Sequence, residues 1–313
     1  MTHSAKREFD RAILDLDTAI SLNPKDARAY NDRCLVRFER KEYDRALADC
    51  DNAVRTDPKY AGATKSRGRV RLRMRNYDGA IEDFSKAIQL NEGDVQAYLE
   101  RCAGYAAMGD YDSAMTNCNR AVELEPKLAA ALSSRGSVYL RQGRFEQAMA
   151  DYDAAVKLRP ESPSAYANRG WGHFYRGNLE AAQSDLNVAI EMSPQEPYYP
   201  IWLYLARARD GQDATSDLAK TLGELNLTGW PAPIYKFFLG KIAAESLLQE
   251  AKHIDYRKNQ EQYCEAYFYL GQQALIQDDR NEAIRWFKAT LDTKVAEFVE
   301  YRAALVELWR LNQ

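Results

Sequence analysis

Arginines and aspartates that recur at one fixed interval are the side chains in this sequence most able to form specific contacts. Arginine stands at Arg33, Arg67, Arg101, Arg135 and Arg169, and aspartate at Asp15, Asp49, Asp83, Asp151 and Asp185, with Asn117 filling the gap in the second series. A guanidinium beside a carboxylate forms a bidentate ion pair. We therefore expect a structural charge ladder between helices, in which Arg135→Ala lowers stability more than binding.

A second basic feature is the run "KSRGRVRLRMR", which begins at Lys65 and carries a cation at every second position. With a period of two it would be an edge strand with a basic face, suited to nucleic acid. In a helix, at about 100° per residue, it divides into two stripes. Lys65, Arg69 and Arg73 form one stripe, and Arg67 begins the other. The net charge of −3 argues against a general nucleic-acid binder.

Catalytic and metal-binding patterns are missing from the sequence. The three histidines, His3, His173 and His253, have no second histidine at metal-ligand spacing and no triad partner. No glycine-rich phosphate loop follows the usual spacing. We therefore expect no enzyme activity, no metal, no cofactor and no small-molecule substrate.

The five cysteines contain two pairs with equal spacing, Cys34 with Cys50 and Cys102 with Cys118, while Cys264 is left over. Both pairs occupy small columns of a repeat, where a free cysteine packs as a small hydrophobe. The first cysteine of each pair should face the alanine four residues before the second. That register would place the two Cα atoms beyond the limit of about 7 Å for a disulfide. We therefore expect free thiols.

These columns belong to an internal repeat of 34 residues. The most regular columns are Ala12, Ala46, Ala80, Ala114, Ala148 and Ala182; Ala19, Ala53, Ala87, Ala121, Ala155 and Ala189; and Pro24, Pro58, Pro126, Pro160 and Pro194. Small residues let antiparallel helices approach closely, and the proline blocks continuation of the second helix. The period predicts an all-α array of stacked helix pairs.

Aromatic residues at the fourth position of several repeats (Tyr30, Tyr98 and Tyr166) complete a pattern that resembles the tetratricopeptide repeat family. The resemblance implies two helices per repeat and a right-handed superhelical solenoid whose concave groove is lined by the first helices. Five complete repeats would span residues 27–196. Residues 1–26 would be the orphan second helix of a truncated repeat.

That orphan helix has apolar residues without one partner. Truncation, a start further upstream, or a covering second chain would each explain it, and the last predicts a homodimer through this helix. Residues 197–313 would form irregular helices, a further repeat-like helix pair at about 264–293, and a capping helix at the end.

The C-terminal third, through "IWLYLARA", "FFLGKIAAESLL" and "YFYLGQQAL", resembles the NlpI-type bacterial tetratricopeptide lipoproteins. The resemblance implies an envelope-associated scaffold that binds proteases and cell-wall enzymes. No lipobox cysteine is present, and no stretch is apolar enough for a transmembrane segment. The protein would be periplasmic or outer-membrane-associated if an export signal is missing from this chain, and otherwise cytoplasmic.

The family's groove-facing positions select a basic wall, a floor of small residues and an aromatic wall. The corresponding residues are Lys65, Arg69, Arg73, Leu99, Arg141, Trp171, Phe174 and Tyr175. We expect this groove to bind a peptide or protein segment that is acidic at one end and apolar or aromatic at the other. Alternatively, the aromatic residues contact C-terminal helices that fill the groove.

The function most consistent with these features is a non-enzymatic interaction scaffold or adaptor with a protein partner. An RNA-binding repeat protein that uses the basic stripe from Lys65 to Arg75, and a purely structural homo-oligomer, are the alternatives. Triple substitution of Lys65, Arg69 and Arg73 by glutamate should abolish partner capture without unfolding the chain.

Overall fold

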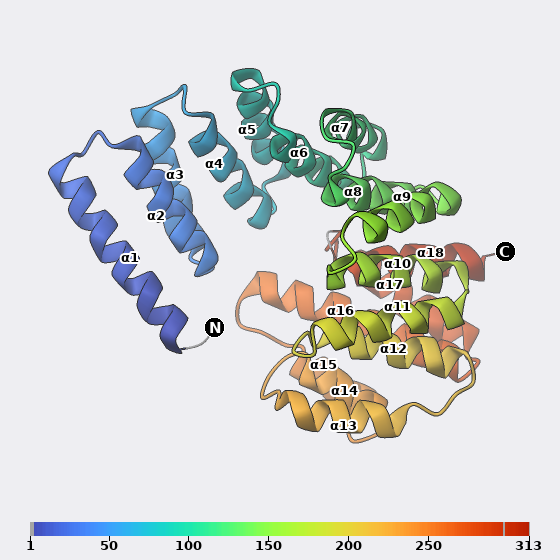
Figure 1. The fold of residues 1–313 in the computed structure, drawn as a ribbon. Coiled ribbons are helices and arrows are strands. Elements are labelled where there is room, and N and C mark those ends of the chain that lie inside the picture. The colour runs from blue at the N-terminus through green and yellow to red at the C-terminus, as the bar shows by residue number, and fades with distance from the viewer. Residues whose placement is uncertain (1–2, 297, 313) are drawn as a thin grey trace. The chain divides into compact units, whose positions relative to one another are not determined.

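The computed structural model describes residues 3–296 and 298–312, and all regular secondary structure in this part of the chain is helical (Figure 1). The chain divides into two compact units, residues 1–126 (unit 1) and residues 127–313 (unit 2). Residues 1, 2, 297 and 313, which belong to the predicted N-terminal and C-terminal segments, lie outside the described residues.

Unit 1 is a stack of antiparallel helix pairs preceded by one further helix. Its helices are α1 (His3–Leu22), α2 (Ala27–Glu39), α3 (Tyr43–Thr56), α4 (Ala61–Arg73), α5 (Tyr77–Leu90), α6 (Val95–Met108) and α7 (Tyr111–Leu124). The pairs are α2 with α3, α4 with α5, and α6 with α7, and helix α1 packs against α2 (Figure 1). The alternating basic run from Lys65 to Arg73 therefore lies on a helix, α4, and not on a strand, and Arg75 follows the end of that helix.

Unit 2 continues with helix pairs and then becomes irregular. Its helices are α8 (Ala129–Arg141), α9 (Phe145–Leu158), α10 (Pro163–Arg176), α11 (Leu179–Met192), α12 (Tyr198–Arg209), α13 (Thr215–Leu225), α14 (Ala232–Phe238), α15 (Ala244–Glu250), α16 (Tyr256–Ile276), α17 (Arg280–Asp292) and α18 (Val299–Leu311). Helices α16 and α17 pair as the repeats do, and α18 packs on both. Helix α18 also contacts α10.

Polar side chains cap the start of several helices in unit 1. The Asp26 side chain accepts hydrogen bonds from the backbone N–H groups of Arg28 and Ala29 at the start of α2. Asp94 and Asp110 cap α6 and α7 in the same way. Such caps satisfy backbone donors that a helix leaves free at its first turn. Polar residues in the sequence therefore mark where α2, α6 and α7 begin.

The small column of each first helix faces the residue 16 positions later on the second helix. A Cβ added at Gly68 would lie 2.7 Å from the ring of Phe84, and one added at Gly136 would lie 2.9 Å from the ring of Tyr152. Only glycine leaves room for these large partners. This register differs from the alanine-facing register expected from the sequence, and it decides the state of the cysteines below.

Helix α1 leaves part of its apolar surface uncovered in unit 1. Leu14 is 66% exposed and Leu22 is 82% exposed. A homodimer through this helix stays a prediction, which light scattering with and without residues 1–26 would test. Among the helices of residues 3–296 and 298–312, none combines the length and apolar character that a bilayer-spanning helix requires.

Candidate protein-interaction site

The arginine ladder joins each first helix to the second helix of its own repeat. In four repeats the guanidinium binds a buried aspartate 16 residues later, with shortest N–O distances of 2.6–2.7 Å. The four pairs are Arg33–Asp49, Arg67–Asp83, Arg135–Asp151 and Arg169–Asp185. In the remaining repeat, Arg101 Nε donates to Asn117 Oδ1 at 2.7 Å. These side chains are therefore committed to holding helices together.

Several arginines of the ladder also form an ion pair with an aspartate of the preceding repeat. Arg33 lies 2.5 Å from Asp17, and Arg67 lies 3.0 Å from Asp51. Arg169 makes the corresponding contact with Asp153 at 3.0 Å. Each of these arginines thus links two successive second helices. Asp15, which the sequence placed in the ladder, is exposed instead, and Asp17 contacts Arg33 in that repeat.

Burial and ion pairing shift the pKa of a ladder carboxylate in opposite directions. Burial raises the pKa of Asp83 above its usual range, while Arg67 and Arg71 beside it oppose the shift. The hydrogen bond to Asp185 raises the pKa of the Arg169 guanidinium, so that this arginine keeps its charge. Losing either partner would leave a charge in a poorly solvated place.

Two disulfides correct the expectation of free cysteines. Cys34 and Cys50 are bonded with a Cα–Cα distance of 5.5 Å, and Cys102 and Cys118 with one of 5.6 Å. Both pairs use the register in which a small residue faces the position 16 residues later. Where that column has glycine, its partner is a large side chain, and where it has cysteine, its partner is cysteine. This complementary change in residue size at positions 16 residues apart was the sequence signal that these two columns face each other. Cys264 is buried and free.

The predicted basic wall lies on α4, and two of its three cations already have partners. Lys65 Nζ lies 2.6 Å from Asp94, and Arg69 Nε lies 3.5 Å from Glu100. Arg69 also stands over the ring of Phe38 at 5.1 Å from its centroid. Arg73 is exposed and makes no ion pair with any residue that the structure describes.

The residues of the predicted groove floor, Arg141 included, differ in how exposed they are. Leu99 on α6 is only 7% exposed, so it supports the helix packing and offers little surface. Ala103, one turn later on the same helix, is exposed. Arg141, at the end of α8 in unit 2, is half-buried and interacts with its own surroundings.

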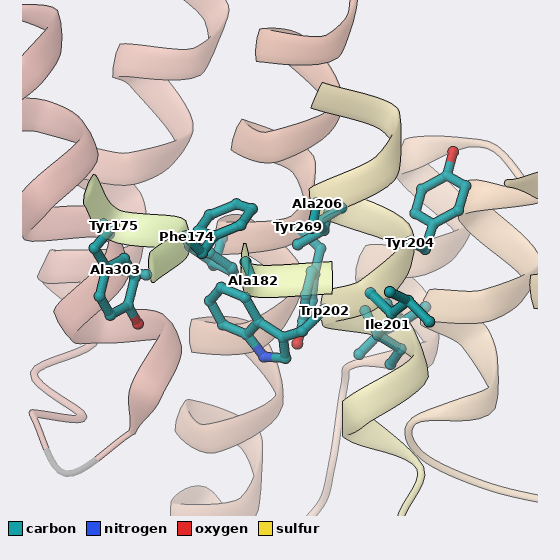
Figure 2. Packing of buried hydrophobic residues seen from close by; sticks show 14 of the residues in the cluster. Phe174, Tyr175, Ala182, Ile201, Trp202, Tyr204, Ala206, Tyr269 and Ala303 are labelled. Carbon is teal, nitrogen blue, oxygen red and sulfur yellow. The ribbon is translucent and has the colours of Figure 1, made fainter. Parts of the chain in front are cut away.

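The predicted aromatic wall is largely covered inside unit 2. Phe174 is fully buried and Tyr175 is 1% exposed, and both rings meet Trp202 of α12 edge-on, as Figure 2 shows. The hydroxyl of Tyr175 donates to the backbone oxygen of Val299 at 3.4 Å. The structure therefore corrects the expectation that Phe174 and Tyr175 anchor a partner, because C-terminal helices occupy their surface. Trp171 remains half-buried.

The histidines take no part in a reactive cluster. Burial lowers the pKa of His173, whose Nε2 atom lies 3.9 Å from Asp185 Oδ2 at the edge of the ladder. His253 Nδ1 accepts a hydrogen bond from the backbone N–H of Asp255. The side chain of His3 is outside those described. Within the described residues, no group of three or more potential ligands is arranged to hold a metal ion.

Two functional candidates escaped the sequence reasoning, namely Glu265 on α16 and Glu300 on α18. They are 4% and 3% exposed and line a pocket of about 370 Å³ beside Trp171. Neither lies in one of the alanine, proline, arginine or aspartate columns of the repeat. A glutamate in an otherwise apolar stretch, as in "YCEAYFYL", was the only signal in the sequence.

Comparison with known families agrees with the stacked helix pairs. Models described as tetratricopeptide repeat or TPR repeat match residues 2–61, 66–94, 104–143 and 136–171. This chain belongs to the tetratricopeptide-repeat family. The predicted all-α repeat fold is thereby confirmed, and the tetratricopeptide fold is that of a protein-interaction scaffold.

Individual relatives cover the tetratricopeptide array to different extents. The chain is 36% identical over 121 residues to the lipoprotein NlpI homolog of Haemophilus influenzae, a match that spans 37% of this chain and 38% of that protein. A thermophilic tetratricopeptide protein of Thermus thermophilus superimposes with a TM-score of 0.54 at 19% identity, over 57% of this chain and 98% of that one. One from Parabacteroides merdae superimposes with a TM-score of 0.52 at 15% identity, over 92% and 99%.

Proposed function

We propose that this protein is a non-enzymatic scaffold that binds a polypeptide segment on the first-helix face of unit 1. This face is formed by the helices α2, α4 and α6. Its contact side chains are Phe38, Lys65, Arg69, Leu72 and Arg73.

The observation that carries the proposal is the state of Arg73. It is exposed, it has no ion-pair partner among the described residues, and it follows the half-buried Leu72 on α4. A free guanidinium beside apolar surface is well suited to a carboxylate on a chain that also has an apolar residue. The first helix α10 of unit 2 offers no equivalent surface, since Phe174 and Tyr175 are covered.

The chemistry of the face favours an acidic segment. Lys65 and Arg69 are held by Asp94 and Glu100, so a partner carboxylate must compete with these ion pairs. Exchange of one ion pair for another yields little net free energy at a hydrated surface. We therefore expect modest affinity that falls as salt is added, with Arg73 supplying the largest single ionic contribution.

The two disulfides support an oxidising compartment for this function. Disulfides persist in secreted, periplasmic and surface proteins and are rare where thiols are kept reduced. The likeness to a lipoprotein NlpI homolog points in the same direction. We propose that the scaffold acts as an adaptor in a bacterial cell envelope, with proteases or cell-wall enzymes as its partners.

The test is capture of partners from the envelope extract of the native host. Arg73→Glu should reduce capture, and the triple change of Lys65, Arg69 and Arg73 to glutamate should abolish it. The control is the triple change of Arg45, Lys59 and Lys86 to glutamate. These three residues are exposed cations of unit 1 outside the face, so the change in net charge is the same.

Circular dichroism must show that all variants keep their helix content. Undiminished capture by the folded triple variant of the face would refute the proposal. Equal loss in the control triple variant would also refute it, because net charge rather than this face would then govern capture.

A further inference from the structure

A pocket inside unit 2 combines carboxyl groups with aromatic rings. It encloses about 370 Å³ between the α11–α12 connection, α10, α12, α16 and the start of α18. Its lining consists of Trp171, Glu196, Tyr198, Tyr199, Glu265, Phe298, Val299 and Glu300. No cationic side chain is among these lining residues, although three carboxyl groups are.

The two most deeply buried carboxyl groups of this pocket have only neutral hydrogen-bond donors. Trp230 Nε1 donates to Glu265 Oε2 at 2.9 Å, and the Tyr269 hydroxyl donates to Glu300 Oε1 at 2.8 Å. Neither carboxyl group forms an ion pair within 4 Å with any described residue. A carboxylate can accept about four hydrogen bonds, so acceptor sites remain on both.

A third buried glutamate in the same unit shows the usual arrangement. Glu307 is 1% exposed, pairs directly with Arg209, and has Arg310 at 3.7 Å. Buried carboxylates are normally compensated in this way, because an unpaired buried charge is costly. Among the described residues, Glu265 and Glu300 have no cation within ion-pair distance, and they border a space that could admit one.

The aromatic walls suit the same kind of ligand. The ring of Trp171 lies 6.4 Å from that of Tyr199, at an angle of 60°, on the lining of the pocket. Faces of tryptophan and tyrosine rings attract cations, most strongly where water is excluded. Aromatic rings also pack against the alkyl chain that carries an ammonium group. Carboxyl groups and rings thus point to one ligand class.

We propose that this pocket binds a primary alkylammonium group, with Glu265 and Glu300 as its charge partners and Trp171 and Tyr199 around its alkyl chain. The three donors of an ammonium group match the free acceptor sites of the two carboxyl groups. A lysine side chain of a partner polypeptide and a free amine both supply this chemistry. The site is separate from the first-helix face of unit 1 and does not depend on it.

Protonation of the pocket makes binding sensitive to pH. Burial raises the pKa of Glu265, with the neighbouring Glu300 adding to the shift, and burial likewise raises the pKa of Glu300. A bound cation favours ionised carboxylates, so binding releases protons and tightens as pH rises. The other titratable or charged groups around the two glutamates are Glu196, Tyr198, Tyr199, Glu261, Tyr269 and Arg302. Of these, Arg302 acts against the raised pKa of Glu300.

The experiment is calorimetric titration of the full chain with three probes. These are the peptide acetyl-Gly-Lys-Gly-amide, the same peptide with norleucine in place of lysine, and n-butylammonium. We expect binding of the lysine peptide, no binding of the norleucine peptide, and proton release when two buffers of different ionisation enthalpy are compared. Tighter binding of the peptide than of n-butylammonium assigns the site to a polypeptide lysine, and equal binding assigns it to a free amine.

Variants locate the binding in the pocket. Glu265→Gln and Glu300→Gln keep size and hydrogen bonding but remove charge, and each should weaken the lysine peptide by about tenfold or more. Glu224→Gln removes an exposed carboxylate of the same unit and should bind as the wild type does. Tyr199 is half-buried and lines the pocket, so Tyr199→Leu should also weaken binding. This variant tests the pocket if a glutamine variant does not fold.

Equal affinity for the norleucine and lysine peptides would overturn the proposal. Wild-type affinity in folded Glu265→Gln and Glu300→Gln would do the same. The absence of proton release, with affinity independent of pH, would show that the two carboxyl groups do not face the ligand.

Discussion

Unit 1 and the C-terminal part of unit 2 hold their helices together by different means. In unit 1 the buried clusters are small, as in the group of Cys34, Ala46, Cys50 and Val70. Arginine–aspartate ion pairs in two repeats and a disulfide in each of two repeats add to them, at recurring positions of the repeat. In unit 2 one large cluster runs from α8 to α18, and its largest buried members include Trp202, Tyr235 and Phe268.

The two regions encode their folds in different ways. A repeat contacts its neighbours through columns that recur in the sequence, so its stability is a sum of similar local terms. The C-terminal region depends on contacts between residues far apart, such as Trp202 with Phe268 at 5.4 Å. The ladder also ends there, because Leu270 and Trp286 occupy the columns that hold arginine and aspartate in the earlier repeats.

The two regions can be observed separately, since all five tryptophans lie in unit 2. They are Trp171, Trp202, Trp230, Trp286 and Trp309. Tryptophan fluorescence therefore reports unfolding of unit 2, while far-ultraviolet circular dichroism reports the helices of both units.

Trp202→Ala should have the largest effect. Trp202 is fully buried among Phe174, Tyr175 and Phe268, and loss of such a side chain costs about 3–5 kcal/mol. Urea unfolding followed by fluorescence should show the loss. Trp309→Ala is the matched control, because Trp309 is 56% exposed and its loss should cost far less. Similar shifts in the two variants would show that the aromatic cluster is not the centre of unit 2.

Removal of one disulfide should come next and should act on unit 1. Cys34 and Cys50 are 16 residues apart, and closing a loop of that length is worth about 3 kcal/mol. The double change Cys34→Ala and Cys50→Ala should lower the stability of unit 1 in circular dichroism and leave the fluorescence transition in place. Added reductant should then have less effect on the variant than on the wild type. Movement of the fluorescence transition instead would contradict the assignment of the bridge to unit 1.

Breaking one rung of the ladder should have a smaller effect. Arg135→Ala leaves Asp151 buried without its bidentate partner. Because the Arg135 side chain is 22% exposed, the expected cost in urea unfolding is about 2–3 kcal/mol, less than for a fully buried pair. Arg159→Ala breaks an ion pair with Glu161 that is more than half exposed, so little change is expected. Equal melting temperatures for Arg135→Ala and the wild type would show that the ladder is not structural.

The smallest effect concerns pH and the buried glutamates of unit 2. A glutamate in an unfolded chain has a pKa of about 4.3. Burial raises the pKa of Glu265 above its ordinary value in the folded protein. The folded state therefore holds more protons above the unfolded pKa, and stability falls as pH rises towards the folded pKa. The slope is at most about 1.4 kcal/mol per pH unit for one proton. Glu265→Gln should flatten this fall in fluorescence-monitored urea unfolding, and an unchanged slope would contradict it.

The sequence alone determined the repeat architecture, because its signals are local and periodic. The alanine and proline columns predicted helix pairs, and the recurring arginines and aspartates predicted a charge ladder between the helices. The 34-residue interval showed that Lys65, Arg69 and Arg73 share one face of a helix. Each of these conclusions needs only helical geometry and the spacing of residues along the chain.

Which columns face each other, and which surfaces stay exposed, depends on the packing of the helices in three dimensions. The register that brings Cys34 to Cys50 depends on how two helices slide along each other, which spacing does not specify. The burial of Phe174 and Tyr175 depends on helices that arrive from far along the chain. Glu265 and Glu300 likewise line one pocket although they lie far apart in the sequence. Tertiary packing brings such residues together, and no repeat spacing in the sequence relates them.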